Sequence, residues 1–243
     1  MLIKETTTKT LSPCEICQGT IGRELYNDGR LSYLMCLNCG FTYLNRDKNA
    51  TALEEFYDQH YVQNRNRVFN FETAIKRLER KGSYENKQKY VSEIAPFVKK
   101  GMRVLEIGSG YGTLLRVLAD KTGVISEGIE PGELGAEVAV KHYKLDVKHT
   151  TLEKELANNM ERYRGRYDAV LMVHVLEHLE DPLKKLKAIK TFLKEPGIIY
   201  IAVPNLSLPD LPFERFFHIE HLSYFTPGLP FTVSNFSSSF TYP

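Results

Sequence analysis

The sequence has no apolar run long enough to span a membrane, and its first ten residues lack the apolar core of a signal peptide. The formal net charge is only +2, so no basic field indicates obligate nucleic-acid binding. Cysteine is scarce as well, with four residues among 243. We therefore expect a cytoplasmic protein with reduced thiols, and the length fits one domain plus a small appendage.

The four cysteines form two Cys-x-x-Cys pairs with 18 residues between them. Four thiolates at tetrahedral reach match a closed structural zinc site, and the expected ligands are Cys14, Cys17, Cys36 and Cys39. A redox pair and an iron–sulfur cluster are the alternatives. The turn at 27–29 and the strand-like segment after it favour a zinc ribbon over both. We predict this ribbon for residues 1–46, where the metal stabilises a segment too short to build an adequate core.

Residues 47–100 are predicted to form a helical linker or lid. A short amphipathic segment, 52–61, would pack the ribbon on the main domain, or its Tyr57 or Tyr61 would cover the active site. Apolar residues then recur at helical spacing over 71–100, and Gly101 would end that helix.

The central motif begins with a short apolar run, Arg103 to Ile107, which reads as a buried strand. Three alternate glycines and an apolar-periodic helix follow it, and these are the parts of a nucleotide-binding βα unit. Glu106 precedes the first glycine by two residues. A carboxylate there would repel a pyrophosphate and suits a ligand with positive charge, such as S-adenosylmethionine.

The pattern Glu-x-Gly-x-Gly-x-Gly resembles the first motif of class I S-adenosylmethionine-dependent methyltransferases. Alternating strands and helices predict a doubly wound, Rossmann-like α/β sheet of about five strands over residues 101–204. An acid 18 residues past the last glycine lies where a ribose is bound, and the family's loop after the third strand commonly faces the adenine. The cofactor-binding residues expected on these grounds are Glu106, Gly108, Ser109, Gly110, Gly112, Glu130, Pro131, Leu152 and Glu153.

The fourth strand, 167–172, opens into a segment that resembles the post-strand motif of many small-molecule methyltransferases. His174 lies nearest the strand tip and could approach cofactor or substrate, whereas His178 would order the loop. For either histidine alone, we expect a structural role. A helix capped by Asp181-Pro182 is expected to extend to Leu193, and the fifth strand is expected at 198–203.

Residues 205–243 are predicted to be a substrate loop and an atypical tail. The Glu-His-x-x-Tyr-Phe portion of this loop resembles that of bacterial sugar (NDP-hexose) C-methyltransferases, which also begin with a four-cysteine zinc domain. That resemblance implies a base that removes a proton beside a ketone, with His221 first and Tyr224 second by position, and His174 as a further candidate. Hydrogen-bonded packing is the structural alternative.

The resemblance also implies a helix and a β-hairpin after the loop, but residues 228–243 show neither helical period nor charge. We therefore expect the last hairpin to be missing, through truncation or a frame shift near Thr226. The expected function is C-methylation of a nucleotide-linked deoxysugar, with no nucleic-acid or membrane partner. The alternatives are a zinc-ribbon RNA methyltransferase and an inactive cofactor-binding protein. A cysteine-nucleophile base methyltransferase would need a fifth cysteine.

Overall fold

The computed structural model describes residues 8–45, 70–79, 85–207 and 216–226. The segment with Tyr57 and Tyr61 and the tail from residue 227 lie outside these residues. The chain forms two compact units, which are described separately. One comprises the described parts of Met1–Arg67, His174–Lys185 and Ala202–Pro243, and the other those of Val68–Val173 and Leu186–Ile201.

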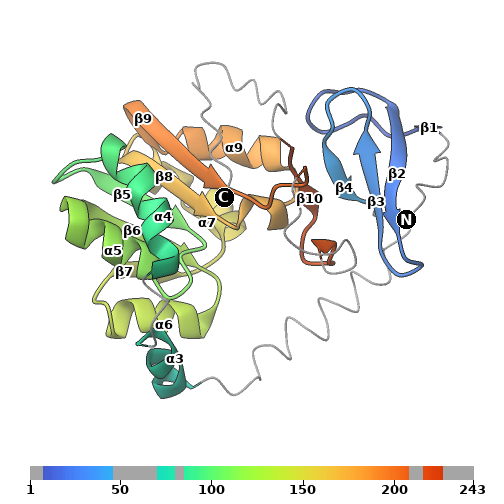
Figure 1. The fold of residues 1–243 in the computed structure, drawn as a ribbon. Helices are drawn as coiled ribbons and strands as arrows, with labels where there is room; N and C mark the ends of the chain where they lie inside the picture. Colours follow the sequence, from blue (N-terminus) through green and yellow to red (C-terminus); the bar gives the residue numbers. More distant parts are fainter. Residues whose placement is uncertain (1–7, 46–69, 80–84, 208–215, 227–243) are drawn as a thin grey trace. The chain divides into compact units, whose positions relative to one another are not determined.

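The second unit is built on a five-stranded sheet in the order β7-β6-β5-β8-β9, which Figure 1 shows with helices on both of its faces. The strands are β5 (Arg103–Ile107), β6 (Ile125–Glu130), β7 (Asp146–His149), β8 (Tyr167–Val173) and β9 (Leu193–Ala202). β5 pairs in parallel with β6 and with β8, and β6 pairs in parallel with β7. Four of the five residues of β5 are buried, as a central parallel strand requires. The expected Rossmann-like α/β fold is confirmed.

Helices connect these strands. They are α3 (Phe71–Leu78), α4 (Glu85–Ile94), α5 (Thr113–Thr122), α6 (Glu133–Lys141), α7 (Leu152–Asn158), α8 (Met160–Tyr163) and α9 (Pro182–Lys190), with 3-10 turns η2 (Ala95–Phe97) and η3 (Leu176–His178). α5 buries the apolar stripe that the sequence shows, from Leu114 to Leu118, and left-handed glycines flank both of its ends.

Two expected boundaries were wrong. The helix predicted to run to residue 100 ends at Ile94, because Pro96 has no N–H to continue it and η2 takes over. The helix predicted to reach Leu193 ends at Lys190, and β9 starts five residues earlier than the predicted fifth strand. The backbone N–H of Tyr167, the first residue of β8, donates to the carbonyl of Phe192. Pairing with β8 therefore begins before the predicted start of the fifth strand.

The first unit has its own five-stranded sheet, in the order β1-β2-β3-β4-β10. Its strands are β1 (Lys9–Thr10), β2 (Ile21–Asn27), β3 (Ser32–Cys36), β4 (Thr42–Leu44) and β10 (Ser223–Tyr224). The turn between β2 and β3 is held by Asp28, whose carboxylate accepts hydrogen bonds from the backbone N–H groups of Arg30 and Leu31. These strands fall where a zinc ribbon was expected.

β10 comes from the loop after β9, yet it completes the ribbon sheet. It pairs antiparallel with β4, with Ser223 opposite Tyr43 and Tyr224 opposite Thr42. Both segments share one apolar core, which contains Tyr33, Leu44, Leu206, Phe216, Phe217, Leu222 and Tyr224. The predicted ribbon and the described part of the predicted substrate loop are therefore one folded body.

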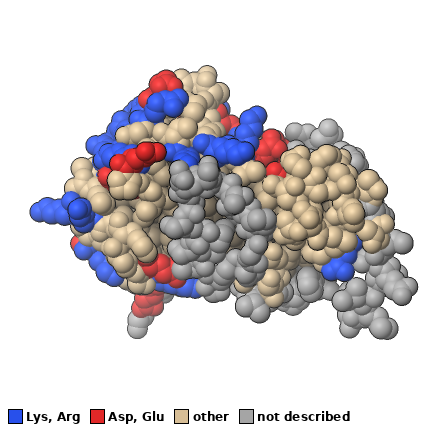
Figure 2. All heavy atoms as spheres, turned by 90° about the horizontal axis from the view of Figure 1, so that it is seen from above, with Lys and Arg blue, Asp and Glu red and all other residues tan. Residues whose placement is uncertain are grey.

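Among the residues described, no helix is both long and apolar enough to cross a membrane. On the face of the molecule shown in Figure 2, Lys and Arg side chains are interspersed with Asp and Glu. A mixed surface of this kind agrees with the near-neutral net charge.

Candidate functional site

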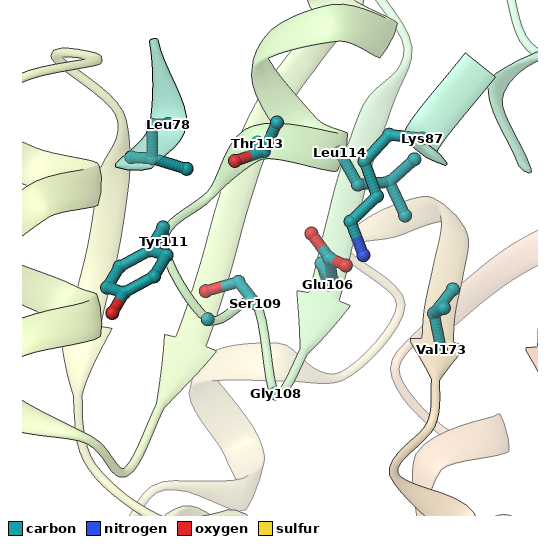
Figure 3. A pocket seen from close by; sticks show the side chains of 10 residues that line it. Leu78, Lys87, Glu106, Gly108, Ser109, Tyr111, Thr113, Leu114 and Val173 are labelled. Carbon is teal, nitrogen blue, oxygen red and sulfur yellow. The ribbon is translucent and has the colours of Figure 1, made fainter. Parts of the chain in front are cut away.

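A cavity of about 340 Å³ lies at the carboxyl end of β5, in the second unit. Figure 3 shows the side chains around it. It is lined by Leu78, Lys87, Glu106, Gly108, Ser109, Gly110, Tyr111, Thr113, Leu114 and Val173. The ends of β5 and β8, the glycine loop, the start of α5, and helices α3 and α4 thus meet at one pocket, where ligands bind in open α/β sheets.

The glycine loop owes its course to backbone conformations that glycine adopts readily. Gly108, Gly110 and Gly112 all have positive φ, of 70°, 55° and 78°. Gly112 is required a second time by packing, since a Cβ there would lie 2.7 Å from the side chain of Leu145. The N–H groups of Gly108 and Ser109 both donate to the carbonyl of Ile129, which ties the loop to β6.

Glu106 is the distinctive group of this pocket. Its side chain is buried, and its Oε2 has no hydrogen-bond partner among the described residues. Burial raises the pKa of this carboxyl to about 8, with Lys87 lowering it and Glu130 raising it further. The hydroxyl of Ser109 is likewise buried without a partner in the described structure. Two polar groups are therefore left for a ligand to satisfy.

Glu130 ends β6 beside the loop. Its two carboxylate oxygens accept hydrogen bonds from the N–H groups of Gly110, at 2.6 Å, and Gly132, at 2.7 Å. Burial raises the pKa of Glu130, and these two donors and His149 oppose the shift. The acid is thus fixed in place by backbone rather than by another side chain.

Several expected cofactor residues do not line the cavity. Gly112 lies between two lining residues in the sequence, Glu130 accepts a hydrogen bond from the N–H of the lining residue Gly110, and Pro131 follows Glu130. Leu152 and Glu153 form the first turn of α7. Leu152 is buried and Glu153 is exposed. Their roles stay predictions.

Sequence reasoning missed the lining residue Lys87. α4 presents it, and Figure 3 shows its ammonium pointing toward the carboxylate of Glu106. Helical periodicity predicts which face of α4 is apolar, but it gives no sign that a half-buried lysine reaches a pocket.

A second group of titratable residues lies in the first unit, around η3 and the loop before β10. Glu177 is fully buried, and neither carboxylate oxygen has a hydrogen-bond partner among the described residues. The rings of His178 and His221 are 4.8 Å apart between centroids, and those of His218 and His221 are 3.7 Å apart. Nδ1 of His174 lies 3.5 Å from Glu177.

His221 is the most enclosed of these imidazoles. Burial lowers its pKa to about 2, and His218, His178 and His174 lower it further by charge repulsion. Its Nδ1 is buried and without a partner in the described residues. The neighbouring His178 donates from Nδ1 to the carbonyl of Glu220, at 2.7 Å, since a carbonyl can only accept.

The structure brings His221 and His174 to this cluster, and the ring centroid of Tyr224 lies 5.2 Å from that of His221. Tyr224 is fully buried, and its hydroxyl donates to the carbonyl of Phe216 at 2.6 Å and accepts from the N–H of His218 at 3.3 Å. His174 has φ of 57°, a strained conformation for a residue with a Cβ, and its N–H donates to Ala202.

Among the residues that the structure describes, two sets of donors could hold a metal ion. The four cysteine sulfurs lie within 4.8 Å of one another, with Cys14 near Cys39 at 3.7 Å and Cys17 near Cys36 at 3.6 Å. In the second set, one donor atom each of Glu177, His178 and His221 lie within 4.8 Å of one another. Four soft sulfurs in a tight cluster fit a structural zinc ion.

The fold is a Rossmann-like domain with a cavity at the end of β5, the position where such sheets usually bind ligands. A family model described as a methyltransferase domain matches residues 77–228. The chain belongs to this family of methyltransferase domains.

Curated relatives support the same family. The chain is 30% identical over 113 residues to a ubiquinone biosynthesis O-methyltransferase of Actinobacillus pleuropneumoniae, a match that covers 44% of this chain and 48% of that protein. It is 36% identical over 110 residues to the Marinobacter nauticus protein of the same name, covering 43% and 45%. The chain thus spans less than half the length of either relative.

Among solved structures, a SAM-dependent methyltransferase from Archaeoglobus fulgidus is 24% identical, with a TM-score of 0.51 over 63% of this chain and 67% of that one. This likeness supports the fold.

Proposed function

We propose that this chain transfers a methyl group from S-adenosylmethionine to a small molecule. The observation that carries the proposal is the buried carboxyl of Glu106 in the glycine-loop cavity, whose Oε2 has no hydrogen-bond partner among the described residues. The amino-acid end of this cofactor carries an ammonium and a sulfonium, so it can supply a cationic partner for the carboxylate of Glu106. When bound, the cofactor provides an electrophilic methyl group.

In this proposal the glycine loop and Ser109 hold the methionine end together with Glu106. Glu130 accepts hydrogen bonds from the ribose hydroxyls, because backbone donors already fix its carboxylate in place. Leu152 and Glu153 face the adenine from the start of α7, with Glu153 taking the exocyclic amine. Pro131 shapes the turn between Glu130 and α6.

For the chemistry, we assign His221 as the base that takes the proton lost by the acceptor as it accepts the methyl group. Its buried Nδ1 has no hydrogen-bond partner among the described residues, and its lowered pKa keeps the imidazole neutral, the form that can accept a proton. Tyr224 then positions the loop, since its hydroxyl is occupied by Phe216 and His218. Strained His174 beside Glu177 is a second group able to contact the substrate.

The cysteine cluster binds structural zinc in this proposal. The metal would hold the ribbon sheet, and through β4 and β10 that sheet holds the loop that contains His221.

Within small molecules, a nucleotide-linked deoxysugar methylated at carbon is our first candidate. Carbon becomes a nucleophile only after a proton is removed beside a ketone, and the imidazole cluster around Glu177 offers such a base. The names of the curated relatives favour a second candidate, methylation at an oxygen atom, for which dihydroxyphenyl compounds serve as probes. Its matches cover less than half of this chain, so we rank it second.

RNA methylation and cofactor binding without turnover each make a different prediction. An RNA substrate would need a basic surface, whereas charges of both signs mix on the face in Figure 2. A protein that binds the cofactor without turnover would give binding and no product with any acceptor.

Calorimetric titration of the zinc-loaded 243-residue chain with S-adenosylhomocysteine tests the cofactor site. We expect saturable binding that weakens by about 1–3 kcal/mol in Glu130→Ala, because hydrogen bonds to a charged group are lost. Glu133→Ala, at an exposed position three residues along, is the matched control and should bind like wild type. No binding by a folded wild-type chain would refute the cofactor assignment.

Methyl transfer from labelled S-adenosylmethionine to a panel of acceptors tests the substrate class. The panel contains nucleotide-linked ketosugars, dihydroxyphenyl compounds and bulk RNA. We expect product with the ketosugars, and a loss of about 100-fold or more in kcat for His221→Ala with cofactor affinity unchanged. Product only with the phenolic compounds would move the assignment to O-methylation.

A further inference from the structure

Lys87 is the only basic side chain among the described residues that line the cofactor cavity. It is half-buried in α4, and Figure 3 shows its ammonium directed at the carboxylate of Glu106. Its Nζ also lies 5.6 Å from the centroid of the Tyr90 ring, so the cation has an aromatic neighbour as well. No motif in the sequence singles it out.

Lys87 and Glu106 are the two side chains of opposite charge type among the described residues that line the cavity. Glu106 is buried without a hydrogen-bond partner for Oε2, and Lys87 is the group that opposes the rise in its pKa. A ligand with a single positive charge would leave Lys87 beside a second cation, which is unfavourable in a pocket of low dielectric. A ligand that brings one cation and one anion can pair with both residues.

Resting on the proposed function, we propose that Lys87 exchanges partners when the cofactor binds. In the empty pocket its ammonium faces the carboxyl of Glu106 and favours the ionised form of that group. In the complex the cofactor's ammonium takes the carboxylate of Glu106, and Lys87 pairs with the cofactor's own carboxylate. Lys87 thereby selects ligands that keep the intact amino-acid end, and α4 contributes to cofactor recognition from outside the glycine motif.

The test compares two ligands that differ in one group. S-Adenosylhomocysteine has the carboxylate, and its decarboxylated analogue keeps the ammonium, the thioether and the adenosine. Calorimetric titration is performed with the zinc-loaded full chain as wild type, Lys87→Met, Lys87→Arg and Lys89→Met. Lys89 is exposed on the same helix and serves as the matched control.

We expect Lys87→Met to weaken S-adenosylhomocysteine by about 10- to 100-fold, the range for a charge-assisted hydrogen bond. The same substitution should change the affinity for the decarboxylated analogue by less than about threefold. Lys87→Arg should retain most of the affinity for S-adenosylhomocysteine, since it keeps the cation. Lys89→Met should match wild type with both ligands.

An equal loss for both ligands would overturn the inference, because Lys87 would then act through the fold or through another part of the cofactor. So would unchanged binding of S-adenosylhomocysteine by Lys87→Met. If the wild-type chain binds S-adenosylhomocysteine, neither of these two results contradicts the proposed function. A folded wild-type chain that binds neither ligand would refute the proposed function and this inference together.

Discussion

The hydroxyl of Tyr33 lies 2.8 Å from the carbonyl oxygen of His221 and 2.8 Å from that of His218. Tyr33 belongs to β3 of the cysteine-bearing sheet, so one buried side chain of the ribbon fixes the backbone at both histidines. Its ring also packs against Phe217 and Tyr224. The ribbon is therefore part of the support of the imidazole cluster.

Tyr33→Phe should separate this support from cofactor binding. Removing the hydroxyl takes a donor from both carbonyls and leaves that of His218 with the N–H of His221, which should lower the free energy of unfolding by about 1–3 kcal/mol. Methyl transfer should fall while the affinity for S-adenosylhomocysteine stays unchanged, because Tyr33 lies outside the cavity. Thermal unfolding, kinetics and calorimetry measure the three effects. Tyr43→Phe, on β4, is the control; an equal loss of activity there would contradict a specific role for Tyr33.

Zinc content tests the cysteine site. We expect one zinc ion per chain by elemental analysis, a loss of this metal in Cys36→Ser, and disruption of the ribbon sheet when a strong chelator removes it, since the segment cannot build an adequate core alone. Methyl transfer should be lost with the metal because β10 pairs with β4.

A second equivalent of zinc per chain would indicate a metal site outside the cysteine cluster. If His178→Ala removed it, the donor atoms of Glu177, His178 and His221 would hold a metal. His221 would then be a ligand, and the assignment of this residue as the base would be contradicted.

Local signals in the sequence predicted much of this site. The alternate glycines and Glu106 lie within seven residues, and the cysteine pairs need only short turns, so spacing alone indicates their geometry. The pairing of Ser223–Tyr224 with Thr42–Tyr43 joins segments about 180 residues apart, and no local pattern encodes such a register. Lys87 was missed for a related reason, because tertiary packing brings α4 to the cavity.

Glu106→Gln should weaken cofactor binding and raise the free energy of unfolding. Between the carboxyl's ordinary pKa of 4.5 and its raised pKa of about 8, the folded state holds more protons than the unfolded state, so wild-type stability falls as pH rises. The variant lacks this slope and should exceed wild type by about 1–3 kcal/mol at pH 8.5, with the gap closing below pH 5. Denaturant unfolding across pH measures it, with exposed Glu133→Gln as control. If the variant were less stable than wild type at pH 8.5, the ionised carboxylate of Glu106 would not be destabilising the folded state.

Cofactor affinity should depend on pH in the opposite direction. The groups that face Glu106 are Lys87 on α4, which lowers its pKa, and Glu130 on β6, which raises it, while the phenol of Tyr111 also lines the cavity. Because the cofactor's cation pairs with the ionised carboxylate, binding below pH 8 releases a proton, and affinity for S-adenosylhomocysteine should rise by up to about tenfold per pH unit toward pH 8. Calorimetry in buffers of different ionisation enthalpy counts that proton.

Lys87→Met should move the rise in affinity to higher pH, since the cation that favours the ionised carboxylate is gone. Glu106→Gln should bind weakly and without this pH dependence, and an equally steep rise in that variant would show that the proton comes from another group.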